Sequence, residues 1–463
     1  MALTLKLFVI IFITVLSAVY IRKNFDHFFD VSIPTLEEIW WGPKSIKADN
    51  KIRSFKIDVS EDVIKDLKYR LENARPFTPP LEGIQQQYGM NTKLLSDVVN
   101  FWKTDYNWKE REEFLNKYPQ FITNIQGLDI HFIHVKPKNI PSGVKILPLL
   151  MLHGWPGSIR EFYEIIPFLT ELNEYNKKSK IIFEVIAPSL PGYGFSKGAI
   201  RPGMGPAEIG VVMKNLMLRL GFDKYYLQGG DWGANIVAHM SALFPNHILG
   251  THSNMCLAMT PGSFIKYLLT LITPSWLIKE TEKVIMTPFE IFELGLLETG
   301  YFHVQATKPD TIGVSLDDSP VGLAAYMLEK FTTGTLIDYK NREDGGLKIK
   351  FTYTNLLDNV MIYWVNKSMT TAARLYSEGF NKNQFKRGLE RTPVTVPYAC
   401  AKFLNDMHMP DSFLTTRFKN LIHSKTYEGG HFAAMEVPKT LAADIYMALE
   451  KIENLQSNNN TEK

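Results

Sequence analysis

The six residues from Gln228 to Gly233 constrain the fold more than any other stretch of this chain. An apolar, aromatic run at 224–227 precedes them and is typical of a β-strand, while 234–240 has the composition of a helix start. Between the two lies the sequence Gly-Gly-Asp-Trp-Gly at 229–233. Glycines on both sides of Asp231 permit a strained turn that pushes its side chain out of a sheet edge. A strand, a tight turn and a helix are therefore predicted, with Asp231 at the turn.

The residue type at this turn limits the chemistry that it can support. A carboxylate forms no useful acyl-enzyme, but it can attack a saturated carbon and leave an alkyl ester. Asp231 therefore favours the hydrolysis of an epoxide or a haloalkane over the cleavage of an ester or peptide. The alternative is a glycine-rich turn that carries a surface aspartate without a function.

A continuous apolar run at 146–152 predicts a parallel strand that is buried on both faces, and 181–187 is predicted to be the next buried strand. A helical pattern at 209–220 precedes the strand that leads to Asp231, and further strands are predicted at 395–401 and 422–427. Alternating strands and helices of this kind predict an α/β fold with a doubly wound sheet. Ligands bind such sheets at the carboxyl ends of the strands.

The stretch 257–392 departs from this alternation, because it is rich in Met, Tyr and Phe at helical spacing. We predict an inserted helical cap there, with kinks at Pro274 and Pro288. Helices that begin at Ser60 and Thr92 are predicted before the sheet. The predicted organisation is a membrane anchor at 1–23, an N-terminal extension at 24–144, a first core segment at 145–256, the cap at 257–392 and a second core segment at 393–463.

The amino terminus has the composition of a membrane anchor. Residues 7–21 contain no charge, and Lys6 is the one charged residue between 2 and 21. About 20 apolar residues span a bilayer. A cleaved signal peptide is the alternative, but 17–21 offers no clean small-x-small cleavage site. Arg22 and Lys23 directly after the run favour a cytosolic position for the rest of the chain.

Composition excludes some classes of partner. The formal charge of the 463 residues is +3 and the basic residues are dispersed, so no nucleic-acid surface is predicted. Two cysteines, Cys256 and Cys400, are too few for a disulfide framework and lack metal-ligand spacing, which fits a reducing compartment. His131 and His134, on a strand predicted at 128–135, are expected on its solvent side.

A partner for Asp231 is predicted at His431, on a glycine-rich loop directly after the last predicted strand. In the α/β-hydrolase fold the order along the chain is nucleophile, acid, histidine, and His431 falls where the base belongs. The turn around Trp155 follows the strand at 146–152. Its backbone N–H and that of Trp232 are predicted to form an oxyanion hole at Asp231.

Four longer motifs of the chain resemble motifs of a known family, the epoxide hydrolases. They are HGWPGS (153–158), APSLPGYGFS (187–196), GGDWG (229–233) and GGHFAAME (429–436). The segment 300–331 is similar to the microsomal branch, and with WWGP (40–43) the resemblance covers nearly the whole chain. It implies that Tyr301 and Tyr376 of the cap hold the oxygen of a small apolar epoxide, with juvenile hormone favoured. It also implies an endoplasmic reticulum membrane location and no cofactor or metal.

One position departs from the family pattern. The resemblance implies a Glu as the acid, and counting back from Pro410 places it at Asn405, beside Asp406. Either residue is a candidate to orient His431, and an amide would stabilise a charged imidazolium less than a carboxylate does. Two alternatives to an epoxide hydrolase therefore stay open: a catalytically impaired hormone-binding relative and, further from the pattern, a haloalkane dehalogenase.

Overall fold

A nine-stranded sheet forms the centre of the molecule, with the order β1-β2-β3-β5-β4-β6-β7-β8-β9. The computed structural model describes residues 33–173, 176–177, 179–271 and 286–461. Strands β4 to β9 pair in parallel, whereas β1, β2 and β3 extend one edge in antiparallel fashion. The strands are β1 (Ile52–Phe55), β2 (Gln120–Ile125), β3 (Leu128–Val135), β4 (Lys145–Leu152), β5 (Ile181–Pro188), β6 (Tyr225–Gly229), β7 (Ile248–Ser253), β8 (Tyr398–Phe403) and β9 (Leu421–Tyr427).

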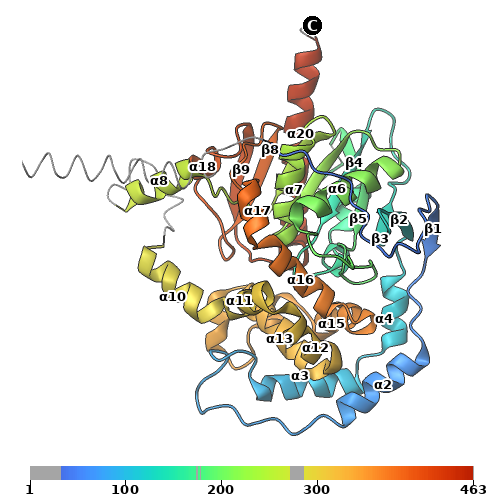
Figure 1. Cartoon of the computed structure of the whole chain (residues 1–463), viewed down its shortest axis with the longest axis vertical. Coiled ribbons are helices and arrows are strands. Elements are labelled where there is room, and N and C mark those ends of the chain that lie inside the picture. Colours follow the sequence, from blue (N-terminus) through green and yellow to red (C-terminus); the bar gives the residue numbers. More distant parts are fainter. Residues whose placement is uncertain (1–32, 174–175, 178, 272–285, 462–463) are drawn as a thin grey trace, which may run out of the picture.

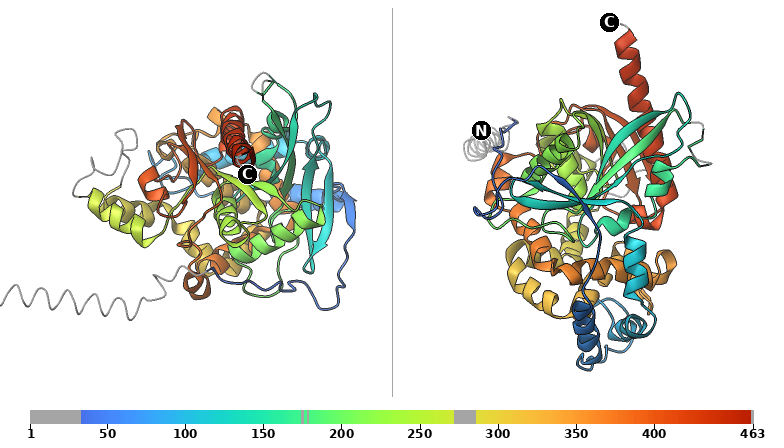
Figure 2. Two further views of the ribbon diagram at one scale, coloured as in Figure 1. Left: turned by 90° about the horizontal axis from the view of Figure 1, so that it is seen from above. Right: turned by 90° about the vertical axis from the view of Figure 1, so that its right-hand side faces the viewer.

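Helices pack on both faces of this sheet (Figure 2). Helix α6 (Pro206–Arg219) packs on α7 (Asp231–Leu243), and α5 (Ile166–Thr170) packs on the carboxyl-terminal α20 (Pro438–Thr461). Strands β5, β6 and β7 and the carboxyl-terminal half of β4 are almost completely buried because both faces of the sheet are covered there. The α/β-hydrolase fold that the sequence predicts is present.

A second body of helices lies beyond the carboxyl ends of the parallel strands (Figure 1). Extension helices α2 and α3 pack against α13 and α15 of this body, and Arg111 pairs with the buried Asp358 at 2.7 Å. The helices outside the sheet layers are α2 (Glu61–Glu72), α3 (Thr92–Thr104), α4 (Trp108–Leu115), α8 (Pro261–Thr270), α10 (Pro288–Glu298), α11 (Gly300–Thr307), α12 (Pro309–Asp318), α13 (Pro320–Thr333), α14 (Leu347–Lys350), α15 (Tyr353–Asn366), α16 (Met369–Gly379) and α17 (Lys382–Arg387). Short turns are η1 (Ile159–Phe162), η3 (Ile337–Asn341), α18 (Asp411–Leu414) and α19 (Ala433–Glu436).

Several local predictions differ from the structure. Strands β1, β2 and β7 were not predicted, and β8 begins at Tyr398 rather than at 395. Asn91, not Thr92, caps α3 by accepting a hydrogen bond from the Lys93 N–H. Pro288 does not kink a helix but starts α10 after the Thr287 cap, as proline at the first helical position commonly does. Pro274 lies outside the described residues.

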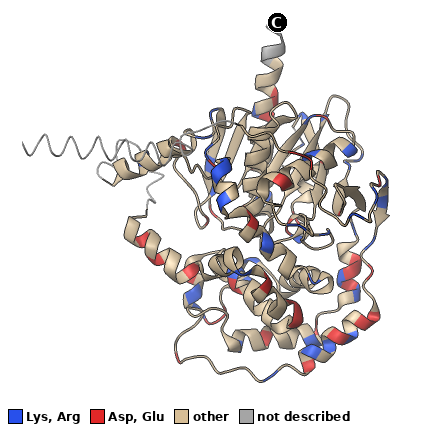
Figure 3. Cartoon of the chain, in the orientation of Figure 1, with Lys and Arg blue, Asp and Glu red and all other residues tan. Residues whose placement is uncertain are grey.

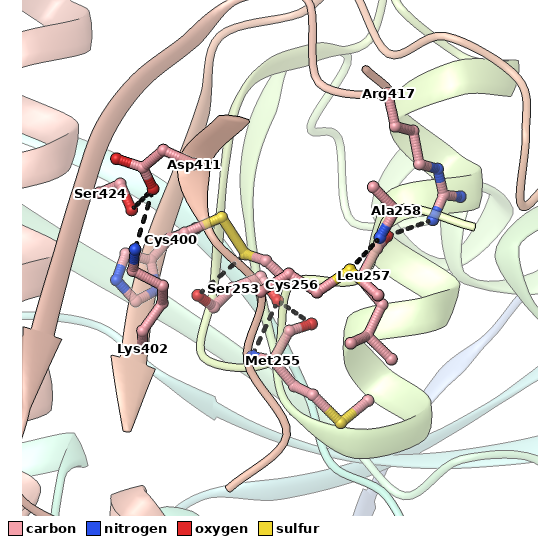
Figure 4. Close-up of a disulfide and its surroundings, with 12 residues drawn as sticks. Ser253, Met255, Cys256, Leu257, Ala258, Cys400, Lys402, Asp411, Arg417 and Ser424 are labelled. Carbon is pink, nitrogen blue, oxygen red and sulfur yellow. Dashed lines mark hydrogen bonds and ion pairs between the residues drawn. A yellow bond between two sulfur atoms is a disulfide. The ribbon is translucent and has the colours of Figure 1, made fainter. Parts of the chain in front are cut away.

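The two cysteines are joined, so the expectation drawn from their number was wrong. Cys256 follows β7 and Cys400 lies in β8, and the two form a disulfide with a Cα–Cα distance of 6.1 Å (Figure 4). The reason is topological, because β7 and β8 are parallel neighbours although 144 residues separate the cysteines. Cysteine content therefore gives no support for a reducing compartment.

His131 was expected on the solvent side of its strand and is instead completely buried. Strand β3 lies between β2 and β5, and the ring contacts Gln120 Oε1 at 2.8 Å and Ser189 Oγ at 3.0 Å. Burial lowers the pKa of His131 to about 3, so it is a neutral core residue. His134, partly buried, contacts Glu184 Oε1 at 2.7 Å.

The predicted anchor at 1–23 lies outside the described residues. Within the stretches of chain that the structure describes, no helix is long and apolar enough to cross a membrane. The predicted boundaries of the five segments stay a prediction.

Candidate active site

Asp231 occupies a strained turn between β6 and α7. Its φ is +49°, a left-handed conformation that residues other than glycine seldom adopt. The surrounding chain approaches so closely that a side chain at Gly233 would meet Leu152 O at 2.0 Å, and one at Gly229 would meet the Gly233 backbone at 2.6 Å. Small residues are therefore required on both sides of Asp231, as the sequence indicated. The carboxylate lies at the amino-terminal end of α7, where the helix dipole favours a negative charge.

The turn after β4 holds one oxygen of this carboxylate. The Trp155 N–H donates a hydrogen bond of 2.8 Å to Asp231 Oδ1. A Cβ on Gly154 would lie 1.9 Å from the same oxygen, so only glycine leaves room for it. Among the described residues, the Trp232 N–H makes no corresponding hydrogen bond with Asp231.

His431 bridges two carboxylates. Its Nε2 lies 3.3 Å from Asp231 Oδ2, and its Nδ1 lies 2.9 Å from Asp406 Oδ1. Burial lowers the pKa of His431, but Asp406 and Asp231 outweigh burial and raise that pKa well above its usual range. The side chains of Asp231, His431 and Asp406 are 21%, 16% and 5% exposed, so the three groups interact with little screening by water.

Asn405, the position that the resemblance implied for the acid, does not supply this contact. Its backbone N–H donates to Gly429 O at 3.1 Å, whereas the next residue, Asp406, accepts the hydrogen bond from the His431 ring. Asp406 Oδ1 also accepts the Met407 N–H at 2.7 Å. A shift of one residue in the loop after β8 therefore leaves a carboxylate beside His431.

The loop that carries His431 is held at three successive backbone N–H groups. Buried Glu436 accepts from Gly430 N–H and Phe432 N–H, each at 2.9 Å, and Gly334 O accepts from His431 N–H at 2.8 Å. Burial raises the pKa of Glu436 to about 7. Sequence reasoning missed Glu436, although it lies in the GGHFAAME motif five residues after His431.

Two tyrosines of the helical body face this group of residues across an aromatic cluster. The Tyr301 ring stacks on Trp155 with centroids 5.2 Å apart, and Tyr376 meets Trp232 edge to face at 4.9 Å. The centroids of the two tyrosines are 6.2 Å apart. Burial raises the pKa of both phenols, and the charge of Asp231 adds to the effect, so both remain protonated donors.

A fourth carboxyl group, Glu161 of η1, was also missed. A Cβ added to Gly157 would lie only 1.4 Å from Glu161 Oε1, so glycine leaves the room for this carboxyl group. Turn η1 packs against α19, which follows His431 in the chain. Burial raises the pKa of Glu161 to about 8, a rise that His431 opposes and Asp231 reinforces. The carboxyl group is therefore largely neutral near pH 7. Its raised pKa comes from burial, which no sequence motif indicates.

Family models match two stretches of the chain. Residues 52–162 match the model described as "Epoxide hydrolase N terminus", and residues 148–270 match the model of the alpha/beta hydrolase fold. The second match contains the Asp231 turn.

Similar proteins extend these matches to most of the chain. Juvenile hormone epoxide hydrolase 2 of Ctenocephalides felis is 51% identical over 89% of this chain and 89% of its own length. Epoxide hydrolase 1 of Oryctolagus cuniculus is 45% identical, with 89% and 92% covered. The crystal structure of juvenile hormone epoxide hydrolase from Bombyx mori superposes with a TM-score of 0.88 at 45% identity, over 90% of this chain and 99% of that one. The chain belongs to the epoxide hydrolase family and is an epoxide hydrolase with the α/β-hydrolase fold.

Proposed function

We propose that the chain converts an apolar epoxide to a diol through an alkyl ester on Asp231. The single observation that carries this proposal is the bridge of His431 between Asp231 and Asp406. In this proposal Asp231 is the nucleophile, His431 is the general base, and Asp406 is the carboxylate that orients His431. The Asp231 carboxylate attacks an epoxide carbon, the carbon–oxygen bond of the ring breaks, and the released oxygen takes a proton from Tyr301 or Tyr376.

The protonation state of His431 links this step to the next. The charges of Asp406 and Asp231 raise the pKa of His431 in the free enzyme. Ester formation removes the charge of Asp231, so the pKa of His431 falls and its proton is transferred to the tyrosinate. Neutral His431 then takes a proton from water, and the resulting hydroxide adds to the ester carbonyl.

The Trp155 N–H, which donates to Asp231 Oδ1, stabilises the negative oxygen of that tetrahedral intermediate. Its collapse breaks the bond between the Asp231 carbonyl carbon and the substrate oxygen, which takes the proton of the added hydroxyl group to give the diol and restore the Asp231 carboxylate. We assign to the Trp232 N–H a second donor role that is taken up only when the ester forms. A haloalkane dehalogenase has no need of paired cap tyrosines, so the pair of Tyr301 and Tyr376 favours the epoxide.

Juvenile hormone is the substrate that we propose. The support is that similar proteins at 51% and 44% identity carry the name juvenile hormone epoxide hydrolase. The aromatic walls formed by Trp155, Trp232 and Phe302 suit an apolar substrate.

The tyrosine roles are tested by single-turnover mixing followed by intact-mass measurement. Tyr301→Phe and Tyr376→Phe should each slow the appearance of a mass increment equal to the substrate, and the double variant should slow it further. Loss of one donor to a developing oxyanion typically costs roughly 10²–10³ in rate. An unchanged rate of adduct formation in the double variant would remove both residues from the site.

We also propose that residues 2–21 anchor the chain in the endoplasmic reticulum membrane, with the remainder in the cytosol. The support is the apolar run with its single charge at Lys6. The paired cysteines give no support for a reducing compartment. The cytosolic position therefore rests on Arg22 and Lys23, which follow the apolar run directly. Glycosylation at the Asn366-Lys367-Ser368 sequon in cells would contradict that side, and loss of membrane binding on deletion of 1–23 would support the anchor.

A further inference from the structure

Helices α8 and α10 expose more apolar surface than any core or solvent-facing role requires. The outer cap surface, as we define it, consists of Phe264, Ile265, Leu268 and Leu269 of α8 together with Phe289, Phe292, Leu296 and Leu297 of α10. Each of these side chains is between 45% and 72% exposed. A concentration of exposed apolar side chains on two successive helices marks a site of interaction with another apolar phase.

Helix α8 has its polarity reversed. Its buried residues are Ser263 and Thr270, while its large apolar side chains point outward. Lys266 is the one charged residue between 257 and 271, and its Nζ donates inward to Ser412 O at 2.5 Å. In Figure 3 the ribbon of α8 is accordingly drawn almost entirely in tan. A helix that faces water normally has the opposite arrangement.

Helix α10 presents the same kind of face. Phe289, Phe292 and Leu296 lie three and four residues apart and therefore share one side of the helix. They are 72%, 66% and 70% exposed, and no residue of α10 is buried. Glu298 on another side pairs with Lys340 at 2.7 Å, which directs the ion pair toward the body and away from the outer cap surface.

The two helices belong to one surface. The Tyr267 hydroxyl of α8 donates to Met286 O, two residues before α10, at 3.1 Å. Figure 1 shows both helices at the same side of the molecule, opposite β1. Helix α10 continues directly into α11, which carries Tyr301.

We infer that the outer cap surface is immersed in the interfacial region of a lipid bilayer. The inference rests on the proposed anchor, since a chain tethered through residues 2–21 always has a bilayer within reach, whereas a second protein copy must be recruited. Outward-facing aromatic and leucine side chains are what the apolar face of a helix lying in a membrane interface presents, while its charged side chains, here the exposed Glu290 and Glu293 of α10, stay among the lipid headgroups. An apolar epoxide dissolved in that bilayer would reach Tyr301 along α10 without crossing water.

The test uses the full chain reconstituted in phosphatidylcholine vesicles. The chain's two cysteines are both in the disulfide. A polarity-sensitive fluorophore that reacts with thiols will therefore label only a cysteine introduced by substitution. Leu268→Cys and Leu296→Cys report on the outer cap surface. Their matched controls are Ile52→Cys on β1 and Val314→Cys on α12, with exposed fractions of 44% and 69% against 45% and 70%.

Lipids that carry a nitroxide on the acyl chain should quench the labels at 268 and 296 at least fivefold more than those at 52 and 314. Equal quenching at all four positions in vesicle-bound protein overturns the inference and leaves the anchor intact. Energy transfer between labelled copies without lipid quenching also overturns it, because the surface would then be a protein interface. A chain that does not float with vesicles overturns the anchor and this inference together.

Discussion

At the scale of single residues, a shift of one position in the chain decides which side chain contacts the His431 ring. Counting along the sequence placed the acid at Asn405, but the loop after β8 brings Asp406 to 2.9 Å from the His431 ring. The sequence located the partner of His431 to within one position, at Asn405 or Asp406. The choice between the two depended on the path of the loop, which no short-range sequence pattern determines.

Replacement of Asp406 should separate the two chemical steps. In Asp406→Asn the attack by Asp231 proceeds, but hydrolysis slows because the imidazolium loses its carboxylate; loss of the acid of a triad costs up to about 10⁴ in rate. Alkyl-enzyme should accumulate and appear as a mass increment equal to the substrate. Asn405→Ala is the matched control and should turn over normally. Normal hydrolysis by Asp406→Asn, with slowed hydrolysis by Asn405→Ala, would reverse the assignment.

Glu161 should impose a pH dependence on stability. Its pKa is raised to about 8 in the folded chain from an ordinary 4.5, so the folded state binds the proton more tightly than the unfolded state. The free energy of unfolding therefore falls as pH rises from about 4.5 to 8 and levels off above. Glu161→Gln lacks this titration, so its Tm relative to wild type should increase between pH 5 and pH 9. The exposed Glu113→Gln is the control, and a constant difference for Glu161→Gln would show that its pKa is not raised.

At the scale of elements, the turns at the carboxyl ends of the strands carry the site, and their glycines were its strongest signal. The apolar strands β4, β5 and β6 were predicted because burial on both faces leaves a continuous run. Strand β1 is four residues long at a sheet edge, and β7 contains Gly, Thr, His and Ser. Neither has an apolar pattern, and pairing with neighbours far away in sequence determines both.

Gly154→Ala tests the closeness of the turn to the nucleophile. The added methyl would lie 1.9 Å from Asp231 Oδ1, so either the carboxylate or the turn must move. We expect the rate of ester formation to fall by at least 10²-fold, since small misplacements of reacting groups cost about that much. The control Gly295→Ala on α10 meets no atom within 4 Å and should leave the rate unchanged. Ester formation at the wild-type rate in Gly154→Ala would refute the geometry.

At the scale of the whole molecule, the disulfide ties together the two ends of the inserted cap. The fold class and the positions of Asp231 and His431 could be anticipated from motifs and chain order, whereas Tyr301 and Tyr376 were implied only by the family resemblance. The disulfide and the burial of His131 could not, because both follow from strand order in the sheet. In β3, an alternating sequence indicated one exposed face, yet the side chains of Phe55, Gln120, Ser189 and Phe195 cover it at His131.

Removal of the disulfide should lower stability more than activity. The bond closes a loop of 144 residues that contains the cap, so its loss releases chain entropy in the unfolded state, typically about 2–5 kcal/mol. The double variant Cys256→Ser with Cys400→Ser should unfold at a lower temperature and keep its kcat at 25 °C. Reductant should lower the Tm of wild type toward that of the variant and leave the variant unchanged. Equal Tm values for the two proteins would show that the bond contributes nothing.

The central claim is that Asp231, not water, attacks the epoxide. The most direct measurement is a single turnover with enzyme in excess over epoxide in water enriched in ¹⁸O. The oxygen added to the substrate then comes from the carboxylate, so the first diol should carry no label and the peptide that contains Asp231 should gain it. A labelled diol with an unlabelled Asp231 peptide would mean direct attack by water and would contradict the account.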